Sequence, residues 1–166
     1  MPSKLVDSDF VHLHVHSHYS LLNAIPTPKE LVKAAKEDNQ QALALTDSGA
    51  LYGIIDFYKA CTKAEIKPII GIDAYLAPRT RFDREVAVDK PRSRVVLLAK
   101  TFVGYQNLIR LVTRSNTEGF YYRPRIDRDL LAQNAEGLIA LSACPSGELM
   151  SALGEGREED ARQTAG

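Results

Sequence analysis

Short apolar runs alternate with amphipathic segments along the chain, and this alternation limits the fold more than any other feature. The runs have strand lengths, and the segments between them repeat their apolar residues with the period of a helix. Such a pattern is typical of an α/β fold built from parallel βα units. The predicted strands are 10–18, 41–46, 68–76, 94–99 and 137–142, with a short extended piece at 121–125. The predicted helices are 27–39, 51–64, 104–115 and 127–133, and a further helix follows the turn at 144–147.

Two local patterns set the boundaries of these elements. At Thr27-Pro28-Lys29-Glu30 a hydroxyl N-cap, a proline at the first helical position and a glutamate at N3 form a capping box, so a helix begins there. Residues 77–92 are charged and contain prolines, which predicts a surface loop.

Composition places few limits on partners. The 166 residues suffice for one core, so we predict one domain over 1–166. The 21 basic and 21 acidic residues cancel, and overall charge therefore gives no sign of nucleic-acid binding. Arginine-rich stretches at 79–94 and 110–128 are interpreted as solvated faces or loops, with a local nucleic-acid-binding patch as the alternative. Cys61 and Cys144 form no disulfide framework, and no segment resembles a signal peptide or membrane span, so we expect a cytoplasmic protein without membrane contact.

All four histidines lie in one run, at positions 12, 14, 16 and 18. On a β-strand alternate side chains share a face about 7 Å apart, which would present several imidazoles together as metal ligands. The alternative interpretation is a half-buried strand whose solvated face happens to carry histidines.

Polar residues also stand at the ends of the other predicted strands. In parallel sheets ligands bind beyond the carboxyl ends of the strands, so these side chains are expected to meet His14 and His16 at one rim. They are Asp47, Ser48, Asp73, Ser142 and Cys144. Singly, each has an ordinary structural explanation: the aspartates suit turns, and the cysteine suits a buried position.

With these residues in place, the chain resembles a known family. The matching segments are 10–17, 19–22, 44–49, 51–53, 67–75, 97–100, 104–108, 119–127 and 137–144. Together they resemble the polymerase-and-histidinol-phosphatase (PHP) domains that form the N-terminal part of bacterial DNA polymerase III alpha subunits. The segment Gly119-Phe120-Tyr121-Tyr122-Arg123-Pro124-Arg125-Ile126-Asp127 in particular is similar to the polymerase branch rather than to free-standing phosphatases.

The resemblance implies a PHP-type distorted (βα)7 barrel. Because the chain stops before the family's final Asp-x-His motif, we expect a C-terminally truncated barrel of about five strands with flanking helices. Such domains carry a cluster of zinc, manganese or iron ions linked to phosphoester hydrolysis or proofreading. Carried over by position, the expected ligands are His14, His16 and Cys144, with Asp73 in place of the family's glutamate.

Three positions depart from the family's ligand set. Asn23 stands for an aspartate, and Ser48 and Arg94 stand for histidines. An inward-pointing Arg94 would oppose a divalent ion by roughly 8 kcal/mol at about 4 Å and an effective dielectric near 20. An outward-pointing side chain would avoid this penalty, and the sequence leaves both orientations open. We therefore predict one divalent metal ion, zinc or manganese, on His14, His16, Asp73 and Cys144, and not a full cluster.

The preferred function is a catalytically weak or silent PHP module of a replicative DNA polymerase, serving as scaffold and docking surface. The expected partners are the proofreading exonuclease subunit, the polymerase core and, through the parent polymerase, DNA. The alternative is an active metal-dependent phosphoesterase or 3′-5′ exonuclease, with His12 or His18 as further ligands. A small metal-storage or sensor protein is the third possibility. An incomplete barrel would leave an open strand edge, so we also expect self-association.

Overall fold

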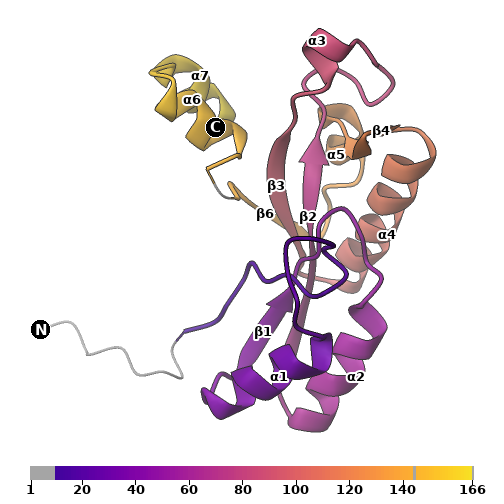
Figure 1. Cartoon of the computed structure of the whole chain (residues 1–166), viewed down its shortest axis with the longest axis vertical. Coiled ribbons are helices and arrows are strands. Elements are labelled where there is room, and N and C mark those ends of the chain that lie inside the picture. The colour runs from indigo at the N-terminus through magenta and orange to yellow at the C-terminus, as the bar shows by residue number, and fades with distance from the viewer. Residues whose placement is uncertain (1–9, 144, 166) are drawn as a thin grey trace, which may run out of the picture.

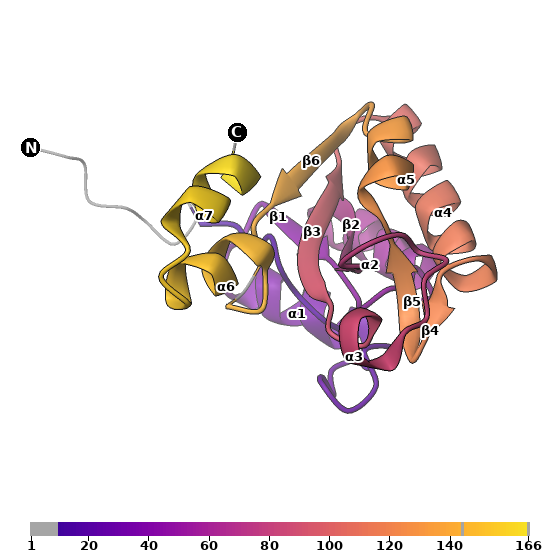
Figure 2. The ribbon, with the colours of Figure 1, turned by 90° about the horizontal axis from the view of Figure 1, so that it is seen from above.

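The computed structural model describes residues 10–143 and 145–165 as a mixed α/β fold around one twisted sheet. In Figures 1 and 2, α4 and α5 lie on one side of the sheet and α6 and α7 on the other. The strands are β1 (Ala42–Leu45), β2 (Lys67–Leu76), β3 (Ser93–Ala99), β4 (Phe120–Tyr121), β5 (Arg123–Ile126) and β6 (Leu138–Leu141). The helices are α1 (Pro28–Glu37), α2 (Ile54–Ala64), α3 (Val86–Asp89), α4 (Phe102–Thr117), α5 (Arg128–Gln133), α6 (Glu148–Gly154) and α7 (Glu158–Ala165).

The central strand is β2, and its two halves have different neighbours. Its first half pairs in parallel with β1, from Lys67 opposite Ala42 to Ile70 opposite Leu45. Its second half pairs with β3 on one edge and with the end of β5 on the other. The order β4-β5-β2-β3-β6 therefore places the middle of β2 where both halves of the fold meet.

The α/β class is confirmed, but the prediction of uniformly parallel βα units is wrong. The pairs β1·β2 and β2·β5 are parallel, whereas β2·β3 and β3·β6 are antiparallel. Residues 77–92, which connect β2 to β3, contain only the four-residue helix α3. A parallel connection needs a long crossover, usually through a full helix. This segment, the excursion 77–92, instead turns the chain back at the end of β2, as Figure 1 shows, so that β3 runs beside β2 in the opposite direction.

The histidine segment is not a regular strand, which corrects the prediction for residues 10–18. It runs beside β1, where Ala44 N donates to His12 O at 3.0 Å and Thr46 N donates to Val15 O at 2.8 Å. The two donors are two positions apart in the sequence but the two acceptors are three positions apart, so the histidine segment holds one residue more than a regular ladder allows, as in a β-bulge. The Thr46 hydroxyl braces this irregularity by accepting from Val15 N at 2.9 Å.

Two of the three buried apolar clusters of the described residues pack helices against the sheet. One packs α1 and α2 against β1, and the other packs α4 and α5 against one face of the sheet. The first consists of Val32, Ala35, Leu43, Leu45, Ile54, Phe57, Cys61 and Ile66. The second consists of Ile72, Ala74, Leu76, Leu97, Leu108, Leu111, Ile126 and Leu130. Because side chains alternate along β2, the residues between these positions, Asp73 and Tyr75, belong to the opposite face.

The arginine-rich stretches are partly solvated, as predicted, since Arg84, Arg110 and Arg123 are exposed, and partly engaged within the fold. Arg125 is fully buried and donates to the backbone carbonyls of residues 81, 83, 89 and 119. Arg81 pairs with Asp127 and Glu118, and Arg79 pairs with Asp89. These contacts fasten the excursion 77–92 to β5 and to the start of α5. None of the helices within the described ranges has the length and apolar character that a membrane crossing requires.

Candidate metal centre

The candidate site is built around Asp73, in the middle of β2. Its carboxylate is fully buried. Its backbone is fixed by the turn that follows β1, because Asp73 N donates to Asp47 O at 3.1 Å and Gly49 N donates to Asp73 O at 2.9 Å. These two hydrogen bonds form a parallel bridge between Ser48 and Asp73, which places the turn after β1 beside the middle of β2.

Two histidines converge on one carboxylate oxygen. His14 Nε2 and His16 Nε2 lie 2.9 and 3.0 Å from Asp73 Oδ2. The two rings are 5.0 Å apart and nearly perpendicular. Their side chains are 32% and 20% exposed, so the site is open to solvent on the histidine side. All three potential ligand atoms lie within 4.8 Å of one another, which would allow them to hold a metal ion.

Arg94 points into this site, which settles the orientation that the sequence left open. Asp73 and Arg94 are diagonal neighbours on β2 and β3, since Tyr75 is opposite Arg94 and Asp73 is opposite Val96. Arg94 Nε donates to Asp73 Oδ1 at 2.9 Å, and its Nη2 pairs with Oδ2. The same Nη2 donates to the Ser48 hydroxyl at 2.8 Å. The guanidinium also lies 5.2 Å from the ring centroid of Tyr75.

Both oxygens of Asp73 are therefore occupied by protein donors. Burial raises the pKa of Asp73, but the hydrogen bonds from His14 and His16 and the charge of Arg94 outweigh it and hold the pKa well below its usual range. A histidine nitrogen that donates a proton to the carboxylate has no free lone pair for a metal. Metal binding and the observed hydrogen bonds consequently exclude one another at each Nε2 atom.

Asp47 has a positioning role. It is buried and accepts from Ser17 N, Ser17 Oγ and Ser20 Oγ at 2.7, 2.7 and 2.6 Å. Ser20 Oγ in turn accepts from Ser48 N at 3.0 Å. These bonds fix the loop that follows His16, so the Asp47 carboxylate positions the histidine segment. No hydrogen bond among the described residues joins the Asp47 side chain to Asp73.

The other candidate residues that the structure describes do not join the cluster. His12 packs against Phe10, and His18 packs against Tyr19, with ring centroids 4.7 and 4.2 Å apart. Asn23 and Ser142 are exposed. Cys144, the predicted thiolate ligand, lies outside the described residues. Cys61 does not replace it, because it is buried in the α1–α2 core, where burial raises the pKa of its thiol to about 11.

Comparison with known proteins identifies the family of the chain. The sequence profile of the PHP domain matches residues 12–166, and the chain belongs to this family. It is 48% identical over 157 residues to DNA polymerase III subunit alpha of Treponema pallidum, covering 94% of this chain and 13% of the relative. The same subunit of Thermus aquaticus is 48% identical over 153 residues, covering 90% of this chain and 12% of the relative.

These relatives confirm the resemblance to the polymerase branch of the family, and the chain spans only about one eighth of their length. Among solved structures, an amidohydrolase from Chromobacterium violaceum aligns with a TM-score of 0.45 and 20% identity, covering 62% of this chain and 32% of the amidohydrolase.

Proposed function

We propose that this chain is the PHP module of a DNA polymerase III alpha subunit and that it works as a scaffold and docking unit, not as a hydrolase. The long, nearly full-coverage similarity to the N-terminal region of alpha subunits supports a place in DNA replication. We further propose that residues 1–166 belong to one PHP unit. Its partners would be the polymerase core, DNA bound by that core, and a proofreading exonuclease subunit.

The ion pair between Arg94 and Asp73 is the observation that carries the proposed loss of hydrolytic activity. A multinuclear centre needs anionic oxygens and unprotonated imidazoles around two or three ions. Here the buried carboxylate is neutralised by a guanidinium, and Ser48 offers that guanidinium only a neutral hydroxyl. The described residues therefore do not fit a full cluster.

A single-ion phosphoesterase or exonuclease is the second candidate. The cluster of His14, His16 and Asp73 favours it, since two imidazoles and a carboxylate also occur as the protein ligands of catalytic zinc. An ion could bind these three groups only if Arg94 left the carboxylate. We therefore propose that Arg94 and a metal ion compete for the Asp73 carboxylate and that Arg94 is preferred.

Metal content and hydrolysis, measured on the same protein, test this choice. The chain is purified without added metal, analysed for zinc and manganese by mass spectrometry, and assayed on single-stranded DNA with each ion added. We expect metal well below one equivalent and no hydrolysis, and the His14→Ala variant should behave like the wild type. Stoichiometric metal, with activity removed by His14→Ala but kept by His12→Ala, would establish the second candidate instead.

Docking requires its own measurement. Titration calorimetry of the alpha subunit with the exonuclease subunit should show saturable binding that His14→Ala leaves unchanged. Binding that depends on added zinc, or no binding at all, would contradict a metal-independent docking role.

A further inference from the structure

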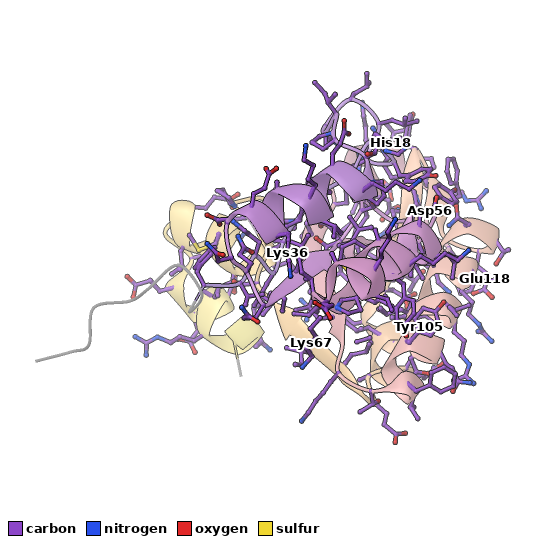
Figure 3. All side chains as sticks on the ribbon, turned by 90° about the horizontal axis from the view of Figure 1, so that it is seen from below. His18, Lys36, Asp56, Lys67, Tyr105 and Glu118 are labelled. Atoms are coloured by element: carbon purple, nitrogen blue, oxygen red, sulfur yellow. The ribbon has the colours of Figure 1, made fainter. Side chains whose placement is uncertain are left out.

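A second feature of the surface lies away from the candidate metal centre, between α1 and α2. Figure 3 views the molecule from the side on which these helices lie next to each other, with Lys36 on α1 and Asp56 on α2 labelled. A groove of about 910 Å³ runs between them. It is lined by Lys29, Val32, Lys33, Lys36, Glu37, Asp56, Lys59, Ala60, Lys63 and Ala64.

The lining residues follow the same helical spacing on both walls. From the first residue of each set, the others follow at three, four, seven and eight positions, so each helix contributes one continuous stripe. The floor of the groove is made of the short apolar side chains of Val32, Ala60 and Ala64. Val32 belongs to the core, and both alanines pack against that core, which leaves space above them that larger residues would fill.

The rims of the groove are strongly basic. Five lysines face two carboxylates in a chain whose total charge is zero. Lys33 pairs with Glu37 at 3.8 Å. Within the described part of the chain, no ion pair joins Lys29, Lys36, Lys59 or Lys63 to a carboxylate of the protein. Lysine stems can line an apolar floor while their charged ends stay above it, which gives a groove with an apolar centre and positive edges.

We propose that this groove, the α1–α2 groove, docks an amphipathic helix of a partner protein that carries aspartate or glutamate on both sides of its apolar stripe. The apolar floor would receive the stripe, and the lysines would pair with the flanking carboxylates. A nucleic-acid backbone would use the lysines but has no apolar stripe for the floor. The combination of floor and charge therefore selects a helix of protein.

The test uses a fluorescent 18-residue peptide with leucines at helical spacing i, i+3, i+4, i+7 and i+11 and glutamates flanking them. Binding to the full chain is measured by anisotropy. The double variant Lys36→Glu, Lys63→Glu should weaken binding by about tenfold or more. A matched double variant, Lys90→Glu, Lys100→Glu, makes the same charge change outside the groove and should retain wild-type affinity.

A floor variant separates the proposed occupant from other anions. Ala60→Gln adds a neutral side chain to the middle of the floor and keeps every charge, so it should also weaken the peptide by about tenfold. Circular dichroism confirms that each variant is folded. Failure of the peptide to bind, or equal binding to Ala60→Gln, overturns the proposal. So does a DNA duplex that displaces the peptide equally well from wild type and Ala60→Gln, or a groove occupied by a second copy of the chain in sedimentation experiments.

Discussion

Arg94 acts at the scale of a single residue by supplying a fixed positive charge where a metal ion would bind. Its guanidinium contacts both oxygens of Asp73, and Ser48 and Tyr75 hold it in this orientation. A buried carboxylate without a partner is costly, so some cation or proton must accompany Asp73. In this structure the guanidinium of Arg94 is the cation that accompanies Asp73.

Replacing Arg94 with methionine tests this role. We expect Arg94→Met to lower the free energy of unfolding by about 2 kcal/mol, because it leaves the buried carboxylate of Asp73 without its guanidinium partner. The loss should be smaller when Asp73→Asn is already present, which urea unfolding of the four proteins in a double-mutant cycle would measure. Zinc should raise the melting temperature of Arg94→Met but not of the wild type. Additive losses in the cycle would contradict the coupling.

His14, His16 and Asp73 could be selected as candidate ligands from the sequence, but the backbone geometry that brings them together could not be predicted. Spacing of two residues places all four histidines on one face, yet only His14 and His16 reach Asp73. The extra residue between His12 and Val15 interrupts the alternation, and it is detectable only through the backbone bonds to β1. The direction of Arg94 likewise depends on neighbours across two strands, which no local pattern encodes.

At the scale of elements, local signals predicted boundaries well. The capping box is formed, with α1 beginning at Pro28. The strands β2 and β3 each begin one residue before their predicted starts. Strand direction could not be predicted in the same way, because it depends on where the excursion 77–92 turns. The strand at 137–142 is found as β6, but the burial that its uninterrupted apolar sequence predicts is wrong, since β6 is half-buried or exposed along its length.

The start of α4 depends on one glycine. A Cβ at Gly104 would lie 1.9 Å from the carbonyl oxygen of Gly137, so backbone approaches backbone where α4 meets the turn before β6. Gly104→Ala should therefore lower the free energy of unfolding by about 3 kcal/mol. Gly154→Ala is the matched control, because nothing lies within 4 Å of its added Cβ, and it should be neutral or slightly stabilising. Equal urea midpoints for both variants would rule out the close contact.

Asp127 links the excursion to α5 and should give a pH-dependent contribution to stability. Burial raises the pKa of Asp127. The N–H donors from Arg81 and Leu130 and the Arg81 guanidinium lower it by a larger amount, so the pKa lies below its ordinary value. A depressed folded-state pKa stabilises the protein above the unfolded value near 4, and this stabilisation is lost as pH falls through the folded-state value.

Asp127→Asn should accordingly lower the free energy of unfolding by about 1–2 kcal/mol at pH 7. The difference from wild type should begin to shrink below about pH 4, where the carboxylate of the unfolded chain takes up a proton, and it should vanish as pH falls through the lower folded-state pKa. Guanidinium unfolding at a series of pH values measures it. The exposed Asp129, also on α5, provides a control in which substitution by asparagine should have little effect at any pH. A pH-independent difference at position 127 would show that charge is not involved.

At the scale of the whole molecule, the strand order ends in β4 on one side and in β6 on the other, and β6 is the longer of these two edge strands. β6 pairs with β3 along one edge, and no strand among the described residues pairs with the other edge. Ile139 on this strand is 45% exposed. Open, partly apolar strand edges pair with other chains unless charge or covering structure prevents it.

We therefore expect the 166-residue chain to self-associate as its concentration rises, and β6 to be the surface responsible. Ile139→Lys should reduce association, because a lysine on an edge strand opposes pairing with a second edge through its charge and hydration. Val86→Lys removes an exposed apolar residue on α3, in the excursion 77–92, away from β6, and should leave association unchanged. Multi-angle light scattering across a concentration series distinguishes these outcomes. A monomeric wild type at all concentrations would show that the edge is protected, and equal effects of both substitutions would show that association is not specific to β6.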